Sequence, residues 1–342
     1  AYYNAIAKIL KSFIFCKLVV QYNDVPYTEA LKGSAVLTPK YDKAEDIYKD
    51  LVNQMTSAIA AINTAQAATG AAVPNTVAES VDPMFEGDMD LWKKFANTLK
   101  LRMLIKMAGV PALSAYATTE FNALNTTLGF LTDDALVNPG YLKEANRQNP
   151  LYNSLAAASD NTRAQGQAIP TKWIFTFYNG PKLIDPGRGS VIYRGFPSTA
   201  LNQLGEENTT STQVPPNTYT SWFTGTNFNT PGLGVAKGPA QGQPIILAAE
   251  SYFLQAEAYT RGYLTGNAAD AFKAGITASF RYLYKNQSNV VDPGKQVDTD
   301  VTTYLTTNAA SPLANFALAL TTEQKIEAII TQKYIAFNVI HS

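Results

Sequence analysis

Residues 244–285 read PIILAAESYFLQAEAYTRGYLTGNAADAFKAGITASFRYLYK, and this stretch decides the fold class. Pro244 precedes a strongly apolar segment that continues to Tyr263, which predicts a helix. Gly266-Asn267 interrupts the pattern and leads into a second predicted helix, Ala268–Lys285. Two helices joined by a short turn are the building unit of helical bundles and α-solenoids.

The rest of both flanks has the same character. Apolar residues at three-to-four spacing predict helices at 2–20, 42–65, 88–108, 112–125 and 321–340. Asp88 or Asp90 is expected to cap the helix at 88–108. The last helix is expected to place Ile330 and Tyr334 on its apolar side, beside Ile329. We therefore predict a mainly α fold with an α-solenoid core, although no steady period of about 34 residues repeats along the chain.

The middle of the chain, from about Gln165 to Gln243, has a different composition. It holds 8 of the 18 prolines and 11 of the 21 glycines, and few charged residues. Such frequent breakers predict long loops with short strands at most. The stretch is also rich in aromatic residues, which a disordered linker would lack. We therefore expect ordered loops that pack onto the helices.

The aromatic residues of these loops are the candidate ligand site. Aromatic rings stack on the apolar faces of sugars, and neighbouring amides bond the hydroxyl groups. The candidates for ligand binding are Trp173, Tyr178, Asn179, Tyr193, Tyr219, Trp222 and Phe223. The alternative is that each ring anchors its loop onto the core, as aromatic side chains commonly do.

Composition argues against several other classes of protein. Lys plus Arg equals Asp plus Glu at 27 each, so no basic surface for nucleic acid is expected. The only histidine is His341 and the only cysteine is Cys16, which leaves few ligands for a metal and none for a disulfide. Cys16 lies in an apolar stretch and is expected to be buried. No cofactor or metal site is predicted.

Two groups of carboxylates invite a catalytic or metal-binding interpretation. Glu250 and Glu257 lie on one face of a predicted helix and could serve a glycoside hydrolase. Seven residues of helix rise is about 10 Å, longer than the separation that such mechanisms use. We expect them instead to tie their helix to Arg or Lys on a neighbour. Asp82, Asp88 and Asp90 lack the spacing of an EF-hand and are expected to be structural.

Several motifs along the chain resemble the SusD/RagB family, the glycan-binding lipoproteins of the Bacteroidetes outer membrane. The YNDVPYTEAL turn at 22–31 is similar to the family's "GDVPYSEAL", with Asn23 where glycine is usual. Four further stretches resemble family motifs, in family order: PKYD and EDIY at 39–48, GDMDLWKKFANTLKLR at 87–102, ESYFLQAEAYTRG with GITAS at 250–279, and QKYIAF at 332–337. The segment around Trp92 points to the branch of starch-binding-associated outer-membrane proteins.

The resemblance implies a tetratricopeptide-like scaffold of paired helices and a non-catalytic role. It implies a single SusD-like domain over 1–342, with a helical scaffold at 1–130 and 243–342 and a loop-rich ligand-binding insert at about 131–242. Family members bind an oligosaccharide or polysaccharide and pass it to a SusC-like TonB-dependent transporter. They are held on the extracellular face of the outer membrane by an N-terminal lipid. In this family the lipid is carried by a region that we expect to precede the present chain. We also expect a further C-terminal region to follow the chain.

Three alternatives remain at this stage. The same fold could bind peptides or another nutrient, for which a deep cavity with polar walls would be expected. A hydrolase using Glu250 and Glu257 is the second alternative. The third is a protein–protein adaptor that uses the loops as its contact surface.

Overall fold

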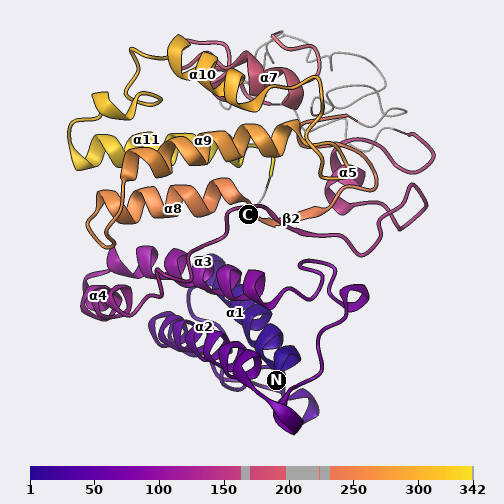
Figure 1. Ribbon diagram of the computed structural model, residues 1–342, viewed down its shortest axis with the longest axis vertical. Helices are drawn as coiled ribbons and strands as arrows, with labels where there is room; N and C mark the ends of the chain where they lie inside the picture. Colours follow the sequence, from indigo (N-terminus) through magenta and orange to yellow (C-terminus); the bar gives the residue numbers. More distant parts are fainter. Residues whose placement is uncertain (163–169, 198–222, 224–231, 341–342) are drawn as a thin grey trace. The chain divides into compact units, whose positions relative to one another are not determined.

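The computed structural model describes residues 1–162, 170–197, 223 and 232–340, and these residues are mostly helical (Figure 1). The predicted mainly α fold is thereby confirmed. The chain forms two compact units. Unit 1 comprises Ala1–Leu131 with Gly262–Thr265, and unit 2 comprises Thr132–Arg261 with Gly266–Ser342.

Unit 1 is built from four α-helices in the described residues. They are α1 (Tyr2–Tyr22), α2 (Ala44–Ala67), α3 (Met89–Ala108) and α4 (Ser114–Asn122). In Figure 1, α1, α2 and α3 lie side by side, and α4 packs on α3. Cys16 is 2% exposed on the inner side of α1, as expected for a small apolar side chain. The predicted helix at 112–125 is shorter in the structure, because a 3₁₀ turn occupies Pro111–Leu113.

Two aspartates organise the start of α3. Asp88 caps the helix by accepting hydrogen bonds from the backbone N–H groups of Asp90 and Leu91, as predicted. Asp82 is 4% exposed and accepts a hydrogen bond of 2.7 Å from Nε1 of Trp92. It also accepts from the N–H groups of Phe85 and Gly87. Its carboxylate is fully used inside the fold, which agrees with the structural interpretation.

Unit 2 holds the remaining elements of the described residues. The first of them along the chain are β1 (Ala135–Val137), α5 (Pro150–Leu155), α6 (Lys172–Phe175), α7 (Pro186–Ile192) and β2 (Gln243–Ile246). They are followed by α8 (Ala248–Thr260), α9 (Ala268–Tyr284), α10 (Val297–Thr307), a 3₁₀ turn (Phe316–Leu318) and α11 (Thr322–Ala336). None of the helices in the described part of the chain is long and apolar enough to span a bilayer.

The prediction of a helix directly after Pro244 was wrong by about one turn. Gln243–Ile246 is a strand that pairs antiparallel with Ala135–Val137. Its exposure alternates along the strand, so Pro244 and Ile246 are buried while their neighbours are partly exposed. This alternation is typical of a strand. It could not be recognised in the sequence, because helix α8 begins two residues later and its apolar residues continue the apolar run of the strand.

Helices α8 and α9 form the centre of unit 2. They run side by side in Figure 1, and α11 packs against both. Gly275 of α9 lies where the ring of Phe253 of α8 comes closest. A Cβ at this position would stand 2.5 Å from a ring carbon of Phe253. Because any larger residue would push the helices apart, this glycine sets the α8–α9 spacing.

Buried charges hold the C-terminal end of α9. Lys237 is 4% exposed, and its amino group donates hydrogen bonds to the carbonyl oxygens of Tyr282 and Lys285. The Lys285 carbonyl lies just past the helix, and the Tyr282 carbonyl also accepts from the N–H of Lys285 at the helix end. The Lys285 ammonium donates to Asp133 at 2.8 Å and to Asp134 at 3.2 Å. The strand β1 region and the helix end are thereby connected.

Candidate functional site

The structure divides the seven predicted site residues into three groups. Tyr219 and Trp222 lie outside the described residues. Tyr178, Tyr193 and Phe223 are buried in the core of unit 2. Trp173 and Asn179 are exposed, and Trp173 keeps 51% of its surface in solvent.

The buried rings do not form a surface in the structure, which corrects the expectation for them. Tyr178 and Tyr193 are 0% and 1% exposed, with ring centroids 5.6 Å apart. Asn338, just after α11, donates hydrogen bonds to both hydroxyls, at 3.0 Å and 2.5 Å. Because the hydroxyls have this internal partner, both rings can be buried at little cost. Burial raises the pKa of both phenols, so they stay neutral.

Trp173 is exposed because of its place in α6. The helix is a single turn whose N-cap is Thr171, and the turn buries Ile174 and Phe175 but not Trp173. Phe177 stands edge-on to the Trp173 ring at 5.7 Å between centroids. Asn179 lies at the start of the tight loop that follows, where its exposed amide can reach a ligand.

Tyr334 of α11 is a second exposed ring, and it contacts Phe177. Its centroid is 5.8 Å from that of Phe177, and 46% of its surface is exposed. The sequence placed Tyr334 and Ile330 on the apolar side of this helix, but both are exposed. The buried side of α11 is formed by Ala328, Ile329, Gln332, Ile335 and Ala336. We call Trp173 and Tyr334, together with Phe177, which is 5% exposed and contacts both, the aromatic surface.

A lysine lies over the aromatic surface. The Lys182 ammonium is 4.2 Å from the centroid of Trp173 and 5.3 Å from that of Phe177. Its backbone N–H donates to the carbonyl of Thr176, which fixes the loop beside α6. A cation over an indole face is attracted by the negative charge of the ring face. Ring faces, an ammonium and an amide together suit a ligand that is apolar on one face and rich in hydroxyls at its edges.

A buried ion pair supports the loop that carries Lys182. Arg188 of α7 is fully buried and donates from Nε to Oδ2 of Asp185 at 2.5 Å. It also donates to Ser279 of α9 at 3.1 Å and to Gln332 of α11 at 3.3 Å. No local sequence pattern marks Arg188 as a buried side chain that joins helices. The pair Asp185-Pro186 is typical of a helix start, and it was the only local indication that Asp185 would cap α7.

Glu250 and Glu257 are engaged in ion pairs. Glu250 is 2% exposed, and its Oε1 lies 3.9 Å from Nζ of Lys333 on α11. Glu257 accepts a hydrogen bond of 2.8 Å from Nε of Arg261 at the end of its own helix. Glu250 therefore ties α8 to a neighbouring helix, as expected, whereas the partner of Glu257 is local. Among the described residues, no group of histidine, cysteine or acidic side chains could hold a metal ion.

The class of protein follows from comparison with known families. A family model described as starch-binding, associating with the outer membrane, matches residues 1–340. The chain belongs to this SusD-like family. No curated protein matches the chain significantly.

Solved structures of SusD homologues share the fold. One from Bacteroides fragilis is 20% identical, with a TM-score of 0.64, and the match covers 99% of this chain and 69% of that one. One from Bacteroides vulgatus is 23% identical, with a TM-score of 0.66 and coverages of 98% and 65%. A chitin-binding SusD homologue from Flavobacterium johnsoniae is 21% identical, with a TM-score of 0.64 and the same coverages. The chain thus spans about two thirds of the length of these relatives.

Proposed function

We propose that the protein binds a neutral oligosaccharide on the aromatic surface and has no catalytic role. The observation that carries this proposal is the exposure of two rings from different parts of the chain, Trp173 at 51% and Tyr334 at 46%. Phe177 contacts both rings edge-on. Two large exposed rings that pack against one buried ring form an apolar patch, and such patches mark interaction sites. The chitin-binding relative supports a carbohydrate as the ligand class.

The aromatic surface can recognise a sugar without enclosing it. A pyranose stacked on Trp173 would bury apolar surface on both partners, worth roughly 25 cal/mol per Å². Lys182 and Asn179 can supply directional hydrogen bonds to hydroxyls at the edge of the sugar. An open surface of this kind gives modest affinity and fast release. Such release suits a protein that hands its ligand to another.

The proposed role includes delivery. The ligand passes to a SusC-like TonB-dependent transporter, and an N-terminal lipid holds the protein on the extracellular face of the outer membrane. Family membership supports this part of the proposal. In the single SusD-like domain that we propose, the insert at 131–242 contributes Trp173 and Phe177, while the scaffold contributes Tyr334.

Calorimetric titration tests the proposed site. Wild type is titrated with chito-oligosaccharides, malto-oligosaccharides and short neutral peptides, beside Trp173→Ala and Tyr334→Ala. We expect each variant to lose about tenfold or more in saccharide affinity, which is about 1.4 kcal/mol. Tyr41→Ala is the matched control, because Tyr41 is 73% exposed and belongs to unit 1. Binding of peptides alone, or saccharide affinity unchanged in both variants, would contradict the proposal.

A further inference from the structure

A groove in unit 2 lies apart from the aromatic surface and makes no use of its residues. It runs along helices α8 and α9 and has a volume of about 330 Å³. Its lining comes from α8, α9 and the segment before β1: Thr132, Asp133, Asp134, Ala248, Tyr252, Asp270, Lys273, Ala274, Thr277, Ala278 and Arg281. This volume is near the lower end of the range for small-molecule sites, about 300–1,000 Å³.

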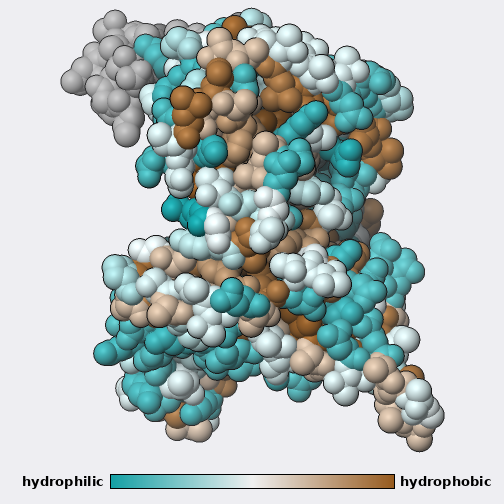
Figure 2. All heavy atoms as spheres, turned by 60° about the vertical axis from the view of Figure 1, so that its left-hand side comes forward, coloured by the Kyte–Doolittle hydropathy of each residue, from teal (hydrophilic) through white to brown (hydrophobic). Residues whose placement is uncertain are grey.

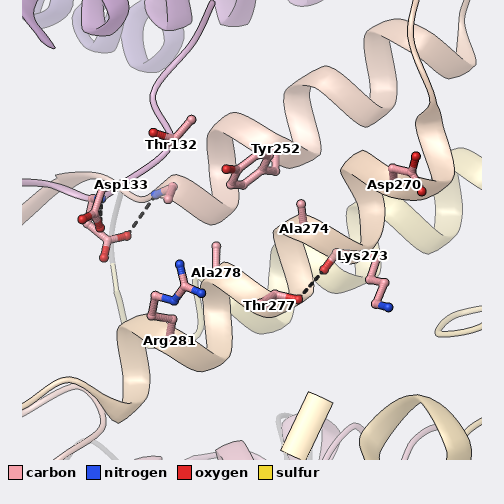
Figure 3. A pocket seen from close by; sticks show the side chains of 11 residues that line it. Thr132, Asp133, Tyr252, Asp270, Lys273, Ala274, Thr277, Ala278 and Arg281 are labelled. Atoms are coloured by element: carbon pink, nitrogen blue, oxygen red, sulfur yellow. Dashed lines mark hydrogen bonds between the residues drawn. The ribbon is translucent and has the colours of Figure 1, made fainter. Parts of the chain in front are cut away.

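The floor of the groove is one face of α9. Ala274, Thr277, Ala278 and Arg281 follow at three- and four-residue spacing, so they lie in a row. Figure 3 shows this row facing Tyr252 of α8, with Asp133 at one end and Asp270 at the other. From Asp270 to Arg281 the helix rises about 16 Å. The small alanine side chains leave room for an elongated molecule.

The polar groups that α9 contributes to the groove are available to a ligand. Arg281 is exposed, and its guanidinium makes no direct ion pair or hydrogen bond within the described part of the chain. The same holds for the side chains of Lys273 and Asp270. Thr277 donates its hydroxyl proton to the carbonyl of Lys273 at 2.9 Å, so its oxygen can still accept. Donors and acceptors therefore alternate along the groove.

With Lys285 counted, the charges in and beside the groove balance. Asp133, Asp134 and Asp270 line the groove together with Lys273 and Arg281, while Lys285 lies outside the lining and is paired with the first two aspartates. A polyanion would be repelled by the aspartates, and a polycation by the lysine and the arginine. A neutral ligand rich in hydroxyls can instead bond to both signs. Tyr252, partly buried against the core, offers an aromatic ring for its apolar face.

We propose that this groove is a second binding site for a short neutral oligosaccharide. Tyr252 stacks on one sugar unit, while Arg281 and Asp133 bond the hydroxyls at one end and Asp270 and Lys273 bond them at the other. The choice of ligand class rests on the proposed function, but the residues are independent of it. Two sites on one molecule would hold a longer glycan more strongly than either alone.

The surface in Figure 2 gives a contrast to this site. On the face drawn there, hydrophobic residues gather among polar ones in unit 2. Leu318 and Leu320, near the 3₁₀ turn, are exposed apolar residues of unit 2, and the hollow beside Leu320 is lined by Lys325 with no acidic residue. We base no site on them, because this hollow lacks the mixture of acidic and basic groups that the α8–α9 groove has.

The test uses a background in which the aromatic surface is removed. Trp173→Ala/Tyr334→Ala is titrated with chito- and malto-oligosaccharides by calorimetry, alone and with Arg281→Ala or Tyr252→Ala added. We expect residual binding with one site per molecule, weakened at least tenfold by either addition. Arg147→Ala, another exposed arginine, is the control and should leave residual binding unchanged. Tyr252→Phe keeps the aromatic ring and should therefore retain most of the residual affinity. If Tyr252→Ala proves unstable, the test relies on Arg281→Ala.

The outcomes separate the two proposals. If wild type binds saccharide and the Trp173→Ala/Tyr334→Ala variant does not bind it at all, the groove site alone is overturned. Residual binding that is indifferent to Arg281→Ala and Tyr252→Ala also overturns it. Full affinity in the double variant, lost on adding Arg281→Ala, supports the groove and overturns the aromatic surface. No saccharide binding by wild type overturns both.

Discussion

Nε of Arg188 lies 2.5 Å from Oδ2 of Asp185, and neither side chain has measurable contact with solvent. The guanidinium also stacks on Phe280 and Tyr304, at 4.7 Å and 4.9 Å. Gln332 accepts from Arg188 and donates to the Tyr304 hydroxyl at 2.7 Å. One arginine thus connects α7 with α9, α10 and α11. Because α11 also carries Tyr334, this cluster holds part of the aromatic surface in place.

Replacement of Arg188 by Met is expected to destabilise the protein strongly. It leaves Asp185 buried without its cation, and breaking a buried pair in this way costs about 3–5 kcal/mol. The measurement is the free energy of unfolding from urea titration. Arg147→Met is the control, because the Arg147–Glu144 pair is more than half exposed and should contribute about 0–1 kcal/mol. Equal effects of the two variants would show that the buried cluster is not a major source of stability.

Lys237 should make stability depend on pH. Burial lowers the pKa of Lys237 to about 7, whereas an unfolded lysine titrates near 10.4. Between these values the unfolded chain binds more protons than the folded one. The free energy of unfolding therefore rises with pH in this window, by on the order of 1 kcal/mol per pH unit. The nearby charges of Asp133 and Asp134 outweigh burial and raise the pKa of Lys285, which stays charged throughout.

This dependence is checked by urea unfolding at about pH 7.5 and about pH 9.5. Wild type should gain stability between these values relative to Lys237→Met, which has no proton to lose. The exposed Lys143 gives a matched control, and Lys143→Met should behave like wild type. Parallel curves for wild type and Lys237→Met would show that Lys237 does not titrate in this range.

Glu250→Gln and Glu257→Gln separate a structural role from a catalytic one. We expect Glu250→Gln to lower the free energy of unfolding by about 1 kcal/mol, because it weakens a buried contact with Lys333. Glu257→Gln should cost less, because Arg261 is partly exposed. Saccharide affinity should be unchanged in both. Release of reducing ends by wild type, abolished in either variant, would instead reveal a hydrolase.

Local sequence patterns predicted α1–α4, α8, α9 and α11, because apolar residues recur along these helices at helical spacing. The cap Asp88 at the start of α3 was also predicted, since the cap and the groups that it bonds are neighbours in sequence. Local patterns missed α10, and the prediction of loops with short strands at most over 165–243 was wrong for α6 and α7, which are short helices. The strand at Gln243–Ile246 was missed because four residues are too few to show a period before α8 begins. Its partner β1 is far away in the chain and could not be identified locally.

The candidate site was predicted only in part, for a related reason. Trp173 was chosen from composition, but Tyr334 was not, because Phe177 brings them together only in the folded chain. Tyr178 and Tyr193 have the same local composition as Trp173, yet they are buried. The residue that permits this, Asn338, belongs to a different segment. The predictions for Tyr219 and Trp222 stay predictions.

The two described tryptophans differ sharply in their surroundings. Trp92 is 2% exposed and its indole N–H is bonded to Asp82, while half of Trp173 faces solvent beneath the Lys182 ammonium. Their emission spectra should differ accordingly, with Trp173 emitting at longer wavelength. A sugar that stacks on Trp173 would remove water and displace the ammonium, so its emission should shift to shorter wavelength while that of Trp92 stays constant. In a Trp222→Phe background, the intrinsic fluorescence of the protein would then report occupancy of the site without a label.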